Sequence, residues 1–185
     1  MRTVLNSVVL VCALILMLPV AQMALAAGAK AGVSHTVVAA SGTAAPAGGN
    51  YGIFTHVTMN ARSQIAFDAS LGGPSTSGVF VGDGRRTSTI ALGGDPDPAA
   101  ANFAFVGNPF FTADGDVVFD ANFTDTFRHD RRVTIPLVRN GDAAPGGGTV
   151  TPTSRVTNAR GMIAYQASVI GATASPRARR ASWLS

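Results

Sequence analysis

The strongest pattern of apolar and polar positions is an eight-residue stretch that occurs three times along the chain. The copies are Asn60–Phe67, Thr112–Phe119 and Asn158–Tyr165. In each copy a polar turn precedes a segment whose larger apolar side chains recur at every second position. A period of two is typical of a β-strand, so each copy predicts a turn that leads into a strand.

A second marker precedes every copy at a nearly fixed distance. It is a Gly-Thr/Asp-x-x-Pro turn, and its prolines, Pro46, Pro98 and Pro145, lie 21, 21 and 20 residues before the aromatic residue that closes the copy. Two markers that keep their spacing over three copies indicate an internal repeat.

The first unit predicts two alternating strands on either side of its motif turn. The first strand, Tyr51–Met59, is expected to place Tyr51, Ile53, Val57 and Met59 on one side. The second strand, Gln64–Leu71, is expected to be half-buried. Its apolar face is predicted to hold Ile65, Phe67, Ala69 and Leu71, and its opposite face Asp68 and Ser70.

The rest of the first unit predicts a hairpin. Gly78–Val81 and Ser88–Leu92 flank an Asp83-Gly84 turn, and Asp-Gly between two apolar runs is a strong hairpin signal. The aromatic residues that close successive copies are 52 and 46 residues apart. Four short antiparallel strands at such a period are typical of β-propeller blades.

The other units follow this pattern in part. In the second unit the polar segment Thr124–Arg132 predicts that the loop and the third strand are replaced, and Ser34–Ala40 predicts the last strand of a preceding, incomplete unit. We therefore expect an all-β repeat domain over 34–171, with about two and a half to three blade-like units. The expected units are about 41–92, 93–139 and 140–171, followed by a basic irregular tail over 172–185.

The residue types in the repeat suggest their structural roles. An Asn or Thr at the first motif position can accept a backbone hydrogen bond and so nucleate the turn. Gly115 and Gly161 at the fourth position suit a positive φ, whereas Ser63 is expected to be strained there. The closing aromatics are expected to form a core shared by neighbouring units, and the small residues before them, Ala66, Val118 and Ala164, to allow close approach of a neighbouring layer.

The N-terminal segment, residues 1–26, has the features of a secretory signal peptide. Arg2 supplies a positive charge, Val8–Val20 is an uninterrupted apolar run, and Ala24-Leu25-Ala26 is a small-x-small cleavage pattern. A short linker over 27–33 is expected to follow. The alternative, a transmembrane anchor, is disfavoured by Pro19 and by the lack of a following basic cluster. We expect a secreted, periplasmic or cell-surface protein with no stable membrane span after cleavage.

Composition and charge exclude some classes of function. All ten acidic residues are Asp and there is one lysine, which disfavours surface helices. The formal charge is +4, but over 27–176 one Lys and nine Arg balance ten Asp, so the excess lies at the two ends of the chain. A neutral body argues against a nucleic-acid partner.

The repeated Asn-x-x-Gly-x-x-Ala-Phe pattern, together with the sequences over 78–84 and 94–98, resembles the NxxGxxAF tandem-repeat family of exported bacterial proteins, which carry assorted surface anchors. The resemblance covers roughly 36–170. Ser63, Thr112 and Tyr165 depart from the pattern. The resemblance implies a propeller-like array of more repeats than occur here, with no assigned catalytic residues, and the Arg-rich end suggests a truncated member.

The candidate chemical groups have plainer explanations. Asp95/Asp97 and Asp114/Asp116 could offer oxygen ligands to calcium, but neither pair recurs in the repeat, so turn formation is the better interpretation. His35, His56 and His129 lack a second ligand at zinc spacing, and no G-x-S-x-G elbow accompanies the serines. We therefore assign no catalytic, cofactor-binding or metal-binding residue.

These observations favour an exported, non-enzymatic repeat protein that serves as a binding or structural module for an extracellular protein or glycan. Thr124–Arg132 and Gly72–Ser77 are expected to form its binding rim, with the polar loop His129–Arg132 either solvated or a charged contact patch. One alternative is a propeller-type hydrolase or lyase with its site in the loops at one end. Another is a truncated gene product, whose open sheet edges would favour self-association.

Overall fold

The computed structural model describes residues 34–98, 102–158, 162–171 and 183–184. The predicted signal peptide, the linker, Gly161 and most of the predicted tail lie outside them. The described residues form an all-β structure of antiparallel sheets that do not close into a barrel, as the sequence predicted. In this part of the chain there is no helix, and so none long and apolar enough to cross a membrane.

Each sheet corresponds to one repeat unit. The first has the order β1-β2-β3-β4, the second β5-β6-β7-β8 and the third β11-β10-β9. The strands of the first are β1 (Asn50–Met59), β2 (Ile65–Gly72), β3 (Ser77–Gly82) and β4 (Thr87–Leu92). Those of the second are β5 (Val106–Phe111), β6 (Val117–Ala121), β7 (Asp125–His129) and β8 (Thr134–Val138). Those of the third are β9 (Thr149–Thr157), β10 (Ile163–Ile170) and β11 (Trp183–Leu184).

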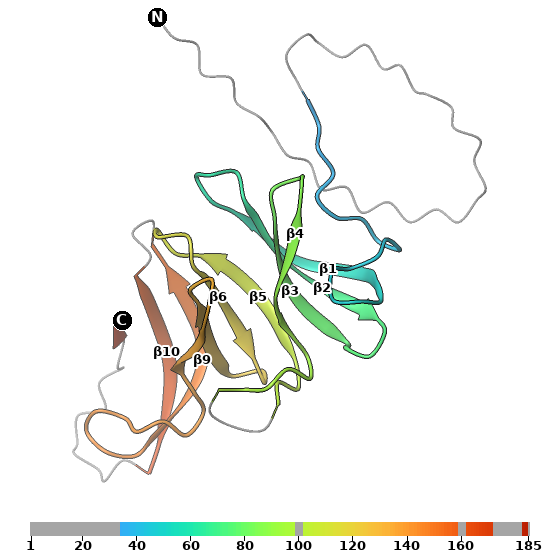
Figure 1. Ribbon diagram of the computed structural model, residues 1–185. Helices are drawn as coiled ribbons and strands as arrows, with labels where there is room; N and C mark the ends of the chain where they lie inside the picture. The colour runs from blue at the N-terminus through green and yellow to red at the C-terminus, as the bar shows by residue number, and fades with distance from the viewer. Residues whose placement is uncertain (1–33, 99–101, 159–161, 172–182, 185) are drawn as a thin grey trace, which may run out of the picture.

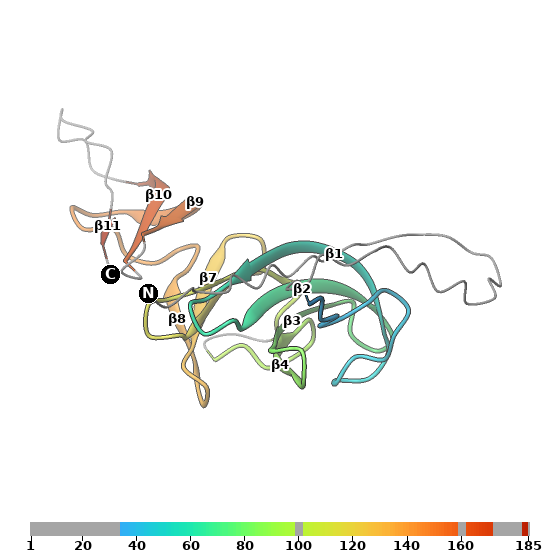
Figure 2. The ribbon, with the colours of Figure 1, turned by 90° about the horizontal axis from the view of Figure 1, so that it is seen from above.

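The sheets stack side by side, from β1–β4 through β5–β8 to β9–β10 (Figures 1 and 2). Apolar side chains fill the spaces between them. Val79 and Ala91 of the first unit share one cluster with Phe119 and Phe127 of the second, and Val118 of the second shares another with residues of the third, among them Tyr165. Because each sheet buries residues against its neighbour, the units stabilise one another.

The motif aromatics behave as predicted where a preceding unit exists. Phe119 and Tyr165 lie in the clusters between units, whereas Phe67 packs with Tyr51 and Phe80 on the outer face of the first unit. That outer face is covered in part by the preceding segment, which contributes Ala45 and the partly buried Val38 and Ala39.

The Gly-Thr/Asp-x-x-Pro turn adopts the same structure in all three units. Gly42, Gly94 and Gly141 have φ values of +82°, +99° and +94°. Each glycine N–H donates to the carbonyl of a residue at or shortly before the start of the next strand, which is Tyr51, Phe103 or Val150. The repeat read from the sequence is therefore a repeat of backbone geometry.

Several details differ from the sequence predictions. Ser34–Ala40 is not a strand, and the chain end predicted to be irregular includes β11. Thr124–Arg132 retains the third strand as β7, because Phe127 is buried there and Asp125 accepts a hydrogen bond from Asn140 N (2.9 Å).

The alternation predicted for β1 is interrupted. Register shifts on either side of Phe54 turn Ile53, Val57 and Met59 to solvent, while Tyr51 stays buried. The half-buried prediction for the second strand is also wrong, since β2 is buried on both faces from Ile65 to Ala69. Ile65, Phe67 and Ala69 pack in a cluster that includes Ala45 of the preceding segment, while Asp68 on the other face contacts the second unit.

Ser63 confirms the backbone requirement of the motif turn. Its φ is +60°, and Gly115 at the same motif position has φ +90°. We expect Ser63→Gly to raise the free energy of unfolding by about 0.5–1 kcal/mol, because the left-handed conformation costs an L-residue about 1–2 kcal/mol and part of the gain is offset by chain entropy. Ala61→Gly in the same turn is the control and should lower it. Urea unfolding of both variants measures the difference, and a loss of stability in Ser63→Gly would contradict the assignment.

Candidate functional site

Asp68 connects the first unit to the second. Its carboxylate accepts hydrogen bonds from His56 N (2.7 Å), Thr55 N (3.3 Å) and Asn108 N (2.8 Å), and it also lies 2.9 Å from His56 Nδ1. The first two donors lie at the irregular place in β1, and Asn108 lies at the corresponding irregular place in β5. One buried carboxylate thus binds the first strands, β1 and β5, of two neighbouring sheets.

At the interface between the second and third units, the residue after the motif aromatic makes different contacts. Asp120, which also follows a motif aromatic, accepts a hydrogen bond from Asn108 Nδ2 (2.7 Å) and pairs with Arg155 of the third unit. The Arg155 guanidinium lies 4.7 Å from the centre of the Phe110 ring, and burial lowers the pKa of Arg155 to about 10. These contacts are structural links between units, and they give His56, Asp68, Asp120 and Arg155 a structural role.

An open groove lies between the first two units at the end that we call the motif-turn end. The motif-turn end comprises the turns Asn60–Gln64, Asp83–Arg86, Thr112–Asp116 and Asp130–Val133. The groove has a volume of ≈ 500 Å³. Its lining residues come from both units and are Arg62, Gln64, Val81, Ser88, Thr89, Ile90, Phe111, Gly115, Val117, His129 and Arg131. We call this the inter-unit groove; its size is that of a typical small-ligand site.

Two arginines from different units converge in the inter-unit groove. Arg62 Nη1 and Arg131 Nη2 lie 3.1 Å and 3.9 Å from the point where a Cβ atom on Gly115 would stand. A side chain at Gly115 would crowd the Arg62 guanidinium, whereas Arg131 lies at ordinary contact distance from the same point. Neither group forms an ion pair with a carboxylate within the described part of the chain.

The turn that carries Arg131 is held by its own aspartate. Asp130 Oδ1 accepts hydrogen bonds from Val133 N (3.0 Å) and Arg132 N (3.2 Å), and these backbone N–H groups lower the pKa of Asp130. Asp83 caps the equivalent turn of the first unit in the same way. Arg131 has φ +74° where the first unit has Gly84 at +83°, so the larger residue occupies a conformation that favours glycine.

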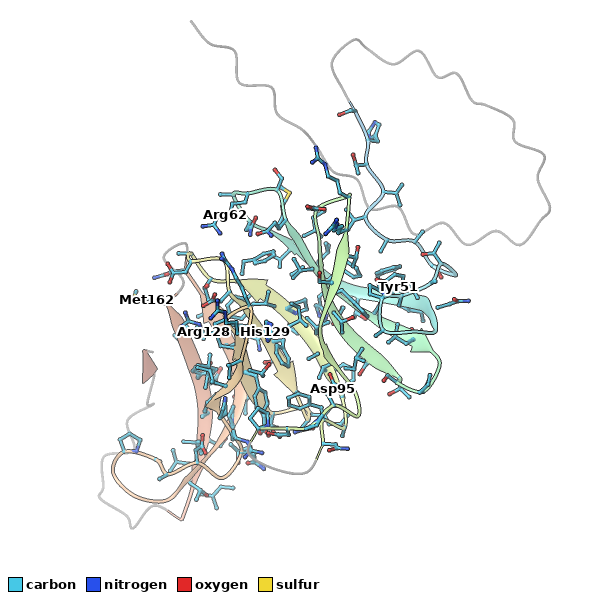
Figure 3. All side chains as sticks on the ribbon, in the orientation of Figure 1. Tyr51, Arg62, Asp95, Arg128, His129 and Met162 are labelled. Carbon is cyan, nitrogen blue, oxygen red and sulfur yellow. The ribbon has the colours of Figure 1, made fainter. Side chains whose placement is uncertain are left out.

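His129 and Arg128 lie beside each other on β7 (Figure 3). His129 lines the groove, its Nδ1 is 3.0 Å from Thr134 Oγ1, and burial lowers its pKa, which favours the neutral ring. Arg128 is engaged by Asp116, with Nε 2.7 Å from Oδ2. The cationic groups that remain to act on a ligand in this groove are Arg62 and Arg131.

The fold separates the residues that the sequence suggested as candidates for calcium binding or a binding rim. Asp95 accepts a hydrogen bond from Leu92 N (2.9 Å) in its turn, Asp97 pairs with Arg139, and Asp116 pairs with Arg128. No three His, Cys, Asp or Glu side chains gather as a metal site in the described ranges. The predicted binding rim is also divided, because β7 places Thr124 and His129–Arg132 at opposite ends of its sheet.

Both tyrosines of the chain are buried, and burial raises the pKa of Tyr51 and of Tyr165 to about 12. We expect tyrosinate absorbance of the folded protein to appear only as the pH approaches 12, and near pH 10 in denaturant. The tyrosine contribution to stability is therefore complete below pH 10 and is lost as the pH rises from 10 towards 12. Ultraviolet titration with and without denaturant measures this, and a folded-state transition near pH 10 would contradict it.

The fold and the groove define an all-β repeat protein of stacked, blade-like sheets with a basic groove between two of them. The chain belongs to a family of unknown function, DUF7453, whose model matches residues 22–134. The match extends across the first unit and ends where β8 begins. No curated protein and no solved structure matches the chain.

Proposed function

We propose that the protein is an exported, non-enzymatic binding module that holds an extracellular ligand in the inter-unit groove. The observation that carries the proposal is the convergence of Arg62 and Arg131, from two different units, in a groove of ≈ 500 Å³. Several other charged residues are engaged within the protein: Asp68 binds Asn108 of the next unit, Asp116 pairs with Arg128, and Asp130 holds its own turn. This pair is instead directed at open space.

Export is proposed from the sequence features of residues 1–26. If they are a signal peptide, protein expressed in a bacterial host should be recovered outside the cytoplasm with an N-terminus close to Ala27. Intact-mass measurement of the secreted form tests this. Recovery of full-length protein in the cytoplasm alone would contradict it.

The binding proposal is tested by closing the groove. Ser88 is exposed on β4 and lines the groove, so Ser88→Trp should fill it while leaving both arginines in place. Purified protein is applied to arrays of glycans and secreted proteins, and the ligands that it retains should be lost in Ser88→Trp. Ser168→Trp, on the exposed end of β10 and outside the groove, should retain them.

The competing function is that of a hydrolase or lyase with its site at the same end, because His129 lines the groove and Asp130 follows it. Mass spectrometry of array ligands after incubation with the protein distinguishes the two functions. Unchanged ligands are expected. Turnover that His129→Ala or Asp130→Ala abolishes would overturn the non-enzymatic proposal, and retention by neither array would overturn the binding proposal.

A further inference from the structure

We infer that the inter-unit groove selects a carboxylate-bearing oligosaccharide, an inference that rests on the proposed binding function. Arg62 and Arg131 bring two guanidinium groups to within 4 Å of one point above Gly115. Like charges held together repel one another, and a bound anion removes that repulsion. A guanidinium also matches the planar geometry of a carboxylate, with two parallel N–H donors.

The charges of the whole array favour an anion at this end. The motif-turn end carries six described arginines and four aspartates, namely Arg62, Arg85, Arg86, Arg128, Arg131 and Arg132 with Asp83, Asp114, Asp116 and Asp130. Asp97, Asp125 and Asp142 lie towards the other end, around Arg139, and Asp95 lies in the turn after β4 at that end. Figure 3 shows Arg62 and Asp95 far apart in this direction. The neutral composition therefore conceals a separation of charge that attracts anions to the groove.

The lining of the groove fits a sugar better than a bare anion. Val81, Ile90 and Phe111 are partly buried apolar side chains, and they offer a surface for the apolar face of a sugar ring. Ser88 and Thr89 provide hydroxyl groups for hydrogen bonds. Apolar walls with a few polar groups are typical of small-ligand sites.

Gln64 adds an oriented hydrogen-bond donor. Its Oε1 accepts a hydrogen bond from Asn60 Nδ2 (2.8 Å), which fixes the amide and leaves its Nε2 group as the donor for a ligand. Asn60 itself is held by the motif turn, where its Oδ1 accepts from Arg62 N (2.9 Å) and Gln64 N (3.0 Å). The turn thus presents an amide donor and a guanidinium to the same groove.

The probe is tetragalacturonate, titrated calorimetrically against the mature protein, with a neutral tetraglucoside of equal length for comparison. The acidic probe should bind at least ~10-fold more tightly, and more weakly as salt is raised. Arg62→Gln/Arg131→Gln should abolish this preference. Arg85→Gln/Arg86→Gln is the matched control, because it removes the same charge at the same end from a turn outside the groove, and it should change the affinity less than ~3-fold.

The arms of the experiment separate the two proposals. Equal binding of acidic and neutral probes, unaffected by Arg62→Gln/Arg131→Gln but lost in Ser88→Trp, would overturn the carboxylate assignment and leave the binding function standing. Tighter binding of a sulfated tetrasaccharide, or of a poly-glutamate peptide, would also overturn it in favour of that ligand. Unchanged thermal unfolding midpoints show that each variant is folded, and Arg62→Lys/Arg131→Lys, which keeps the charge without the fork, should recover only part of the affinity.

Discussion

Phe119→Ala is expected to lower the free energy of unfolding by about 3–5 kcal/mol, a large fraction of the ~5–15 kcal/mol typical of a folded domain. The Phe119 side chain is 0% exposed. Its ring stacks on Phe127 and meets the edge of Phe103, with ring centres 5.9 Å apart in both cases. Because the same cluster includes Val79 and Ala91 of the first unit, the cavity would open between two units.

Phe123→Ala is the matched control for this prediction, because Phe123 is in the same unit and is 83% exposed. It should cost less than about 1 kcal/mol. The milder Phe119→Leu serves as a second variant if Phe119→Ala does not fold. Urea unfolding monitored by circular dichroism gives the free energies.

A double-mutant cycle tests whether Phe119 stabilises the interface or only its own unit. Val79→Ala in the first unit and Phe119→Ala in the second should be non-additive by more than about 0.5 kcal/mol, because both residues line one cluster. Additive losses would show that the two units do not stabilise each other through this cluster. The proposal of a core shared between units would then be wrong.

The sequence predicts the elements that depend on local chemistry. The turns at Gly42, Gly94 and Gly141 need a positive φ, and the strands after each motif turn show their period of two, so both could be identified from residue types. The strand β7 could not be identified in this way. Phe127 is its only large apolar residue, and the burial of Asp125 and Thr126 depends on hydrogen bonds to Asn140 N and Asp120, which no local pattern records.

The candidate site was missed for a related reason. Arg62 and Arg131 come from different units, and they meet only because the units stack with their motif turns at one end. A signal was nevertheless present in the departures from the repeat. The first unit has Gly84 where the second has Arg131, and the second has Asp114 where the first has Arg62. A ligand site is expected where equivalent positions of the repeat carry residues of different chemical character.

Asp68→Ala is expected to cost about 3–5 kcal/mol, comparable to the loss of a buried phenylalanine. Asp68 is 4% exposed and accepts hydrogen bonds from the backbone N–H groups of His56 and Asn108. Removing the carboxylate leaves these donors without a partner, and an unsatisfied buried donor costs about 1–3 kcal/mol. Asp114→Ala, at an exposed turn position, is the control and should change stability by less than about 0.5 kcal/mol.

Amide hydrogen exchange provides the sharper measurement, because the two donors belong to different units. In Asp68→Ala the amides of His56 and Asn108 should both exchange faster, whereas those in the middle of β6 should change only as far as global stability falls. His56→Ala removes only the imidazole contact to Asp68, and it should leave the Asn108 amide protected. If the His56 amide is exposed in Asp68→Ala but the Asn108 amide is not, the carboxylate orders β1 alone, and the stacking of the first two units depends on the apolar cluster around Phe119.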